Sequence, residues 1–233
     1  MDIQVLASGS SGNCYKISDG KTAILLDAGI PIRAIQIKCN FHLNDIAACL
    51  ISHCHKDHSA AANDLAKFGI DIFASQGTIT ECGFVGHRIR PVKALSLFRI
   101  GTFKIIGFDT QHDTPEPLGF LVESTVTNEK LLYFTDSFYI KYKFQGLTHI
   151  MAECNYDKET FQASIHNGRI NKELAPRLIK SHMSLEHLIE LLNANDLKKV
   201  KQIYLMHLSD NNANERLIKE EIQKLTGTEV YIC

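Results

Sequence analysis

The chain has 233 residues, of which 45% are hydrophobic, and its formal net charge is −1. A chain of this length can bury a full core, and sheet-based chains of this size often form one domain. The near-neutral charge argues against a surface that attracts polyanions everywhere, because broad nucleic-acid-binding surfaces carry an excess of Lys and Arg.

The N-terminal residues 1–6 are acidic and run directly into a strand-like segment, which is not the pattern of a signal peptide. No apolar stretch approaches the roughly 20 residues needed to cross a bilayer. The seven cysteines form no CxxC pair, and an odd number cannot all pair within one chain. We therefore expect a soluble, cytoplasmic protein that does not bind membranes and whose thiols stay reduced.

Strand-like apolar runs alternate with helical patterns along the whole chain. Strands are predicted near residues 3–7, 23–27, 46–52, 70–74, 103–108, 118–123, 131–135, 149–153, 202–207 and 229–232. Helices are predicted near residues 31–38, 58–68, 157–166, 184–194 and 212–226. This order fits two sheets covered by outer helices, and no linker divides residues 1–233.

The most informative motif is His53-Cys54-His55-Lys56-Asp57-His58, which directly follows a strand-like run. Two histidines separated by one residue can point at one ion from a strand end. The Asp-His pair beyond them can turn toward a second ion in the first turn of the predicted 58–68 helix. The motif therefore predicts half of a two-metal site.

Three further candidate ligands each follow another strand-like run: His112, Asp136 and His207. Irregular residues at strand ends can direct polar groups into one cleft. A single histidine is more often structural, but together with the motif these residues favour a site. Imidazole and carboxylate ligands suit zinc, manganese or iron.

This pattern resembles the metallo-β-lactamase superfamily over nearly the whole chain. The resemblance implies an α/β fold, an αββα sandwich of two mixed β-sheets flanked by helices. It also implies that one metal binds His53, His55 and His112. The other metal would bind Asp57, His58 and His207, and Asp136 would bridge the two.

A narrower resemblance points to the YycJ/WalJ branch, small proteins of this fold that act as DNA exonucleases. It rests on residues 6–13, 27–29, 134–137, 153–155, 181–184 and 207–212. Asp136 also argues against an antibiotic hydrolase, because two-zinc β-lactamases commonly have a cysteine at the corresponding position. Only 45 residues, positions 137 to 181, separate Asp136 from His182, which leaves no room for an inserted β-CASP domain.

Two divalent ions about 3.5–4 Å apart can share a hydroxide that attacks phosphorus in line, without a protein nucleophile. Asp57 would help to orient that hydroxide. His182 precedes the predicted helix cap Ser184, so it is a candidate phosphate binder or proton donor, or a packed core residue. Asp57 and His182 are the predicted catalytic residues.

Substrate contacts are predicted at four positions. Asn13 lies in a glycine-rich loop that could equally well support a turn, and Asn155 lies in one of the branch motifs. Arg169 and Arg177 lie in segment 166–180, which has four basic residues against one acidic residue and could also be an ordinary solvated face. Residues 212–215 match a helix capping box, for which we favour a structural role.

The leading hypothesis is therefore a dinuclear metal-dependent phosphodiesterase, a DNA exonuclease, with DNA favoured over RNA. The alternative is a small-molecule hydrolase of cyclic phosphodiesters, thioesters or lactones that uses the same ions. A metal-stabilised binding module is the weakest hypothesis, because structural zinc sites are normally closed by four ligands. Whether two copies form a homodimer with a shared groove is left open.

Overall fold

The computed structural model describes residues 1–233 and divides into two compact units. The first unit consists of Met1–Asp109 and Thr114–Glu129, and the second of Thr110–Asp113 and Lys130–Cys233. The four-residue segment Thr110–Asp113, which contains His112, therefore belongs to the second unit, although the residues before and after it belong to the first.

The first unit contains nine strands. Six form a sheet in sequence order, β1 (Asp2–Ala7), β2 (Cys14–Ser18), β3 (Ala23–Leu26), β4 (Ile46–Leu50), β5 (Asp71–Ser75) and β6 (Ile89–Val92). The first three are antiparallel and β3 to β6 are parallel. An antiparallel ladder follows, β7 (Leu97–Ile100), β8 (Phe103–Asp109) and β9 (Leu118–Ser124).

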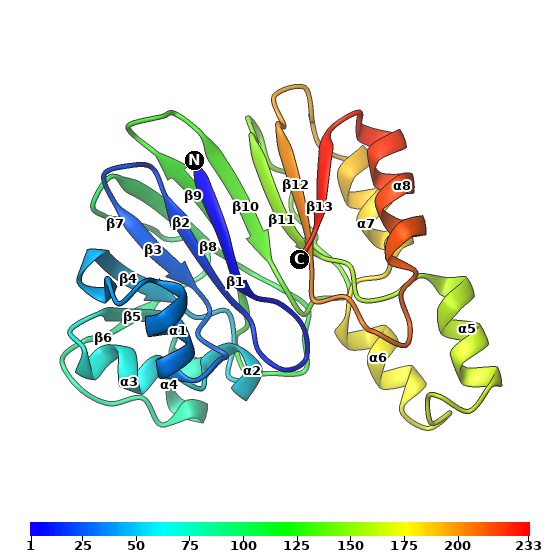
Figure 1. Ribbon diagram of the computed structural model, residues 1–233, viewed down its shortest axis with the longest axis horizontal. Coiled ribbons are helices and arrows are strands. Elements are labelled where there is room, and N and C mark those ends of the chain that lie inside the picture. Colours follow the sequence, from blue (N-terminus) through cyan, green and yellow to red (C-terminus); the bar gives the residue numbers. More distant parts are fainter. The chain divides into compact units, whose positions relative to one another are not determined.

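The helices of the first unit are short. They are α1 (Ile32–Lys38), the 3-10 turn η1 (Leu43–Asp45), α2 (Lys56–Ser59), α3 (Ala62–Lys67) and α4 (Gln76–Cys82). Helices α3 and α4 pack on β5, and α4 also packs on β6 (Figure 1). Their buried faces join a core of aliphatic side chains that includes Leu25, Leu65 and Ile72.

The second unit contains four parallel strands, in the order β13 (Glu229–Ile232), β12 (Gln202–Met206), β11 (His149–Glu153) and β10 (Lys130–Phe134). Its helices are α5 (Lys158–His166), α6 (Ala175–Ser181), α7 (Leu185–Asn193) and α8 (Glu215–Thr226). Helix α8 packs on β13 and on α7 (Figure 1). Helix α7 buries Leu185, Leu188, Leu191 and Leu192, a spacing that places them on one face.

The strand predictions are confirmed at all ten positions, but β2, β6 and β7 were missed. Strand β2 follows the glycine-rich loop without a strong apolar run, β6 contains Pro91, and β7 is short. The predicted helix 58–68 is broken into α2 and α3. The break arises because Asn13 N donates to Asp57 O at 2.7 Å, while Ala61 N donates to Ala28 O at 2.8 Å.

The predicted caps have mixed outcomes. Ser184 caps α7, since its hydroxyl accepts a hydrogen bond from His187 N at 3.2 Å. The capping box that was expected to begin at Asn212 is wrong. Asn214 is the cap of α8 and accepts from Leu217 N at 3.2 Å.

Three buried polar residues just beyond strand ends have a left-handed backbone. Asp27 follows β3 with φ 58°, Asp136 follows β10 with φ 42°, and His207 follows β12 with φ 54°. Such conformations are strained for residues other than glycine, and they concentrate at functional sites. They mark the carboxyl ends of the parallel strands in both units.

We predict that Asp19→Asn removes an acid-sensitive part of the stability. Thr102 and Ser124 each donate to Asp19 Oδ2 at 2.6 Å, which ties the β2–β3 turn to the β7–β8 turn and to the end of β9. Burial works to raise the pKa of Asp19, but hydrogen bonds from Ser124, Thr102, Thr22 and Lys21 outweigh it and lower the pKa to about 2. The carboxylate therefore stabilises the fold above pH 4, and this contribution disappears as the pH falls through about 2.

The variant should lose about 2 kcal/mol of unfolding free energy at pH 7 and lose less further stability between pH 4 and pH 2 than the wild type. Urea unfolding followed by circular dichroism measures both effects. Asp64→Asn is the control, because the Asp64–Lys67 ion pair is exposed. Equal pH profiles for Asp19→Asn and wild type would contradict the assignment.

Candidate metal centre

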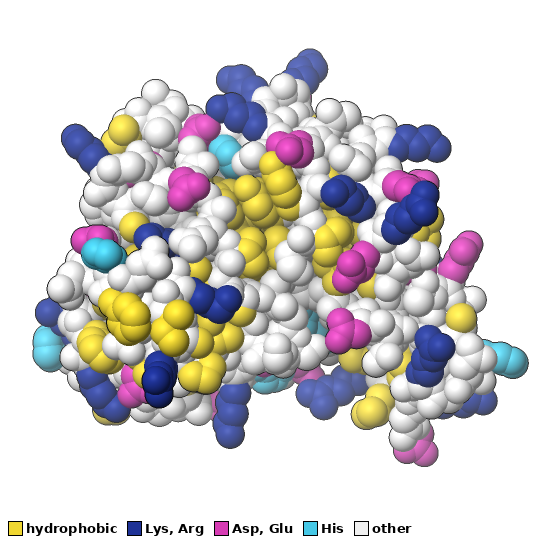
Figure 2. Space-filling view, viewed as in Figure 1, with side chains coloured by type: hydrophobic (Ala, Val, Ile, Leu, Met, Phe, Trp, Pro, Cys, Tyr) yellow, Lys and Arg dark blue, Asp and Glu magenta, His cyan; other side chains and the backbone are white.

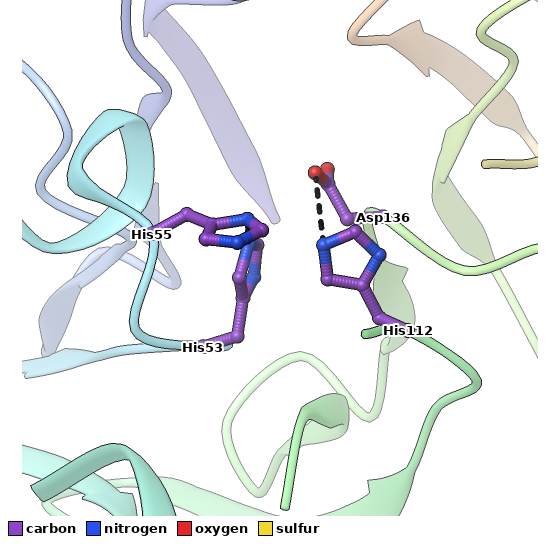
Figure 3. Close-up of side chains that lie close together, drawn as sticks. All are labelled: His53, His55, His112 and Asp136. Atoms are coloured by element: carbon purple, nitrogen blue, oxygen red, sulfur yellow. Dashed lines mark hydrogen bonds and ion pairs between the residues drawn. The ribbon is translucent and has the colours of Figure 1, made fainter. Parts of the chain in front are cut away.

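In the first unit, the four candidate ligands lie in the loop after β4 and in α2. The chain is extended at His55, which precedes α2, and Asp57 and His58 lie in that helix. His53 Nε2 lies 3.1 Å from His55 Nδ1, and the two rings meet edge to face at 79° (Figure 3). Two ring nitrogens that point at a common position are suited to one ion.

The buried Asp27 carboxylate organises these candidate ligands of the first unit. Its Oδ1 accepts from Ser52 N at 2.7 Å, and its Oδ2 accepts from Ser52 Oγ at 2.9 Å. Because the Ser52 hydroxyl donates its only proton to Asp27, Ser52 Oγ can only accept a hydrogen bond from His53. Nδ1 of His53, 3.0 Å away, is therefore the donor. Neutral His53 then carries its proton on Nδ1 and a lone pair on Nε2, as a metal ligand requires.

The same carboxylate fixes His58. Nδ1 of His58 lies 2.7 Å from Asp27 Oδ2 and donates to it, because a carboxylate can only accept. The lone pair of His58 is therefore on Nε2, which lies 3.4 Å from Asp57 Oδ2. The side chain of His58 is fully buried, whereas that of Asp57 is 27% exposed, so Asp57 is accessible to solvent.

Gly29 allows the backbone of Asp57 to approach. A Cβ atom at position 29 would lie 1.6 Å from Asp57 O. Ala28 N also donates to His58 O at 2.7 Å, which joins the end of β3 to α2. The resemblance in residues 27–29 thus has a physical basis in the carboxylate of Asp27 and the missing side chain of Gly29.

Asn13 is fully buried next to these ligands. Its Nδ2 lies 3.1 Å from His58 Nε2 and donates to Gly9 O at 3.0 Å, while its Oδ1 accepts from Tyr15 Oη at 3.0 Å. These contacts favour a role in positioning His58. Contact between Asn13 and substrate stays a prediction.

In the second unit, the end of β10 and the Thr110–Asp113 excursion bring His112 and Asp136 together. His112 Nε2 lies 3.8 Å from Asp136 Oδ2 (Figure 3). Nδ1 of His112 donates to Ser181 O at 2.9 Å, which leaves the lone pair on Nε2. Burial lowers the pKa of His112, against the opposing charge of Asp136, so a neutral imidazole is favoured.

Four groups of the second unit converge on one position. The ligand atoms of Asp136, Glu153, His182 and His207 all lie within 4.8 Å of one another. Nδ1 of His207 lies 3.6 Å from Asp136 Oδ1 and 3.4 Å from Glu153 Oε1. Of these four residues, Glu153 was not among the predicted site residues.

Glu153, the last residue of β11, is fully buried. Its Oε2 accepts from Ser137 N at 2.9 Å and from Met183 N at 3.1 Å, and its Oε1 lies 2.6 Å from Nδ1 of His182. Burial works to raise the pKa of Glu153, but the charge on His182 and the hydrogen bonds from His182 and His207 together outweigh it and lower the pKa. Burial likewise opposes a charge on His182, but Glu153 raises the pKa of its imidazole.

The remaining predicted substrate contacts belong to the second unit. Asn155 is buried, and its Nδ2 donates to His207 O at 2.9 Å, so it supports a ligand-bearing loop. Arg177 makes two contacts of 2.8 Å to Asp113 Oδ2, next to His112. Arg169 is exposed after α5. None of these contacts tests a substrate role.

The chemistry of both donor sets fits divalent metal ions. Each unit supplies buried imidazoles, with the lone pairs of His53, His58 and His112 on Nε2, together with a carboxylate. Such nitrogen and oxygen sets bind zinc, manganese and iron, and geometry alone does not choose among them. Asp27, Ser52 and Glu153 hold the ligands and were missed, although the acids Asp27 and Glu153 could have been found from their places at the ends of strand-like runs.

Comparisons with known proteins agree with this geometry. The β-lactamase superfamily domain model matches residues 22–208. Exodeoxyribonuclease YycJ from Bacillus anthracis is 26% identical over 92% of this chain and 85% of its own length. Exodeoxyribonuclease WalJ from Streptococcus pneumoniae serotype 2 is 28% identical over 91% of this chain and 83% of its own length.

The metallo-β-lactamase fold protein YhfI from Bacillus subtilis has a TM-score of 0.75 at 16% identity, covering 99% of this chain and 95% of that chain. This likeness confirms the predicted fold class, two mixed β-sheets with flanking helices. None of the helices has the length and apolar character needed to span a bilayer. The chain therefore belongs to the β-lactamase superfamily, as a hydrolase with the metallo-β-lactamase fold.

Proposed function

We propose that this hydrolase is a DNA exonuclease that cleaves phosphodiester bonds with two divalent metal ions. The observation that carries the proposal is that candidate metal ligands meet beyond strand ends in each unit: His53 Nε2 lies 3.1 Å from His55 Nδ1, and His112 Nε2 lies 3.8 Å from Asp136 Oδ2. Two relatives that match over most of the chain bear the name exodeoxyribonuclease, which supports DNA as the substrate.

The proposal assigns the ligands to two positions and joins the two units in one domain, residues 1–233, without a β-CASP insertion. One ion would be held by His53, His55 and His112. The second would be held by Asp57, His58 and His207, and Asp136 would be shared between them. The tautomers of His53, His58 and His112 support this assignment, because each has its lone pair on the nitrogen that would face an ion.

When bound, such a pair of ions supplies hydroxide at neutral pH and neutralises charge on the attacked phosphoryl group. Asp57, which is partly exposed, orients the attacking oxygen. Glu153 holds Nδ1 of His182 at 2.6 Å and raises the pKa of the imidazole, so the protonated ring can donate its Nε2 proton to the leaving oxygen. The roles of Asp57 and His182 in catalysis follow from this arrangement as proposals.

A small-molecule phosphodiesterase, thioesterase or lactonase is the competing function. One observation favours it: on the face shown in Figure 2, Lys and Arg side chains are interspersed with Asp and Glu and form no continuous basic patch. We retain DNA as the proposed substrate because of the two named relatives.

We also propose a cytoplasmic location, which suits seven cysteines without a disulfide. A homodimer stays a prediction.

The decisive experiment is digestion of end-labelled single-stranded and duplex DNA, with 5′-phosphate or 5′-hydroxyl ends, in Mn²⁺ or Zn²⁺. Wild type should shorten the DNA stepwise from one end. Asp57→Ala should abolish this activity and lower the metal content, measured by mass spectrometry, from two ions toward one per chain. Asp45→Ala removes an exposed carboxylate and is the matched control. Turnover of a small phosphodiester without DNA cleavage would transfer the assignment to the competing function.

We predict that Asp27→Asn weakens metal binding by about 10- to 100-fold without a change of backbone. Asparagine tolerates the left-handed conformation at φ 58°. Its amide has only one acceptor oxygen, however, so it cannot accept all the hydrogen bonds from Ser52 and His58 that the carboxylate accepts. Chelator competition measures the affinity, and nitrogen NMR of the metal-free protein reports the His58 tautomer. An unchanged affinity and tautomer would contradict the role of Asp27.

His182→Ala should lower turnover about 10²- to 10⁴-fold while two ions remain bound, because the variant loses a proton donor. The measurement is kcat on DNA together with metal content. A substrate with a better leaving group should reduce the defect, since it needs no protonation. Loss of folding or of one ion would instead assign His182 to packing or to metal binding.

A further inference from the structure

Segment Phe138–Phe144 has a composition that the proposed chemistry does not explain. It connects the end of β10 to the start of β11, two residues beyond Asp136, and its sequence is FYIKYKF. It consists of four aromatic residues, two lysines and one isoleucine. We refer to residues 138–144 as the aromatic–basic strap.

The strap is held by its backbone and by two buried side chains. Ile140 and Phe144 are only 5% and 8% exposed. Phe138 O accepts from Nδ1 of His187 at 2.9 Å, and Phe144 N donates to Asn195 Oδ1 at 2.6 Å. An irregular segment anchored in this way against α7 and the residues that follow it presents its other side chains in a defined direction.

The outward side chains combine rings and positive charge. Tyr139 is 47% exposed, and Lys141 and Lys143 are also exposed. Tyr142 is half-buried, with Lys141 Nζ 5.1 Å from its ring centroid. These residues and α7 line a cavity of about 110 Å³. Its lining contains two lysines, Lys141 and Lys143, and one acidic residue, Glu190.

We propose that the aromatic–basic strap binds the single-stranded DNA that enters the site, with a base stacked on Tyr139 and phosphates paired with Lys141 and Lys143. The inference rests on the proposed exonuclease function and specifies how that function engages its substrate. Proteins that bind single strands without sequence preference combine aromatic platforms with positive charge that follows the backbone.

Position and charge both support this occupant. Tyr139 is three residues beyond Asp136, so the two Cα atoms lie within about 11 Å, and Lys143 lies within about 25 Å. A strand of several nucleotides covers this length. The strap supplies two positive charges without an acid of its own, in a chain whose net charge is −1.

A purely structural role would require only the buried residues. Ile140 and Phe144 are the buried side chains of the strap. An exposed tyrosine and two exposed lysines contribute little to that packing, so their removal separates the two roles.

The test measures the affinity of the full chain, kept metal-free with EDTA, for a fluorescein-labelled 12-nucleotide single strand by anisotropy. Tyr139→Ala should weaken binding about 5- to 100-fold, and Tyr139→Phe should retain it. Lys141→Ala/Lys143→Ala should reduce the slope of log K against log salt by about 1.4. Lys219→Ala/Lys224→Ala on α8 is the matched control and should leave the slope unchanged.

Kinetics of the metal-loaded enzyme separate this inference from the proposed function. The strap variants should raise KM for single-stranded DNA and leave turnover of bis(p-nitrophenyl) phosphate unchanged. If wild type degrades DNA and the strap variants bind and degrade it equally well, the inference fails and the exonuclease stands. If wild type neither binds nor degrades DNA, both fail.

Discussion

A single buried carboxylate, that of Asp27, determines how the candidate ligands of the first unit are arranged. It accepts hydrogen bonds from Ser52 and from His58, and Ser52 in turn fixes His53. A buried charge is tolerated only when it is fully hydrogen-bonded, so these partners stabilise the carboxylate while it sets their protonation. The metal-ligand tautomers of two histidines thus follow from one residue that need not touch an ion.

In the second unit, the buried carboxylate of Glu153 positions an imidazole in the same way. Glu153 is buried at the end of β11 and accepts from the backbone of Ser137 and Met183 and from the ring of His182. In both units a carboxylate at the end of a parallel strand holds an imidazole, and nearby residues adopt a left-handed backbone. Strain of this kind persists only where surrounding contacts impose it. The hydrogen bonds to Asp27 and Glu153 are contacts of that kind.

Periodicity and spacing were sufficient to predict the strands that carry the ligands. Runs such as 46–52 and 149–153 are continuous and apolar, as buried parallel strands are. The spacing His53-x-His55-x-Asp57-His58 pointed to metal chemistry. Strand β6 was missed because Pro91 weakens the strand pattern, and helix 58–68 was predicted as continuous because Asn13 is distant in sequence. Long-range contacts such as Asn13 N to Asp57 O do not appear in local patterns. The places of Asp27 and Glu153 at strand ends are local, but their supporting roles are not, since the partners of Asp27 lie 25 to 31 residues away and Met183, a partner of Glu153, lies 30 residues away.

The excursion Thr110–Asp113 has a consequence for how the protein is made. His112 belongs to the second unit, yet β8 precedes it and β9 follows it in the first. The second unit is therefore not a continuous stretch of chain, and a fragment that starts at Lys130 would lack one of its donors. The candidate ligands of the second unit run from His112 to His207, so this set becomes complete only after the whole of the first unit has been synthesised. An ion that needs this full set would bind only after the first unit has been made.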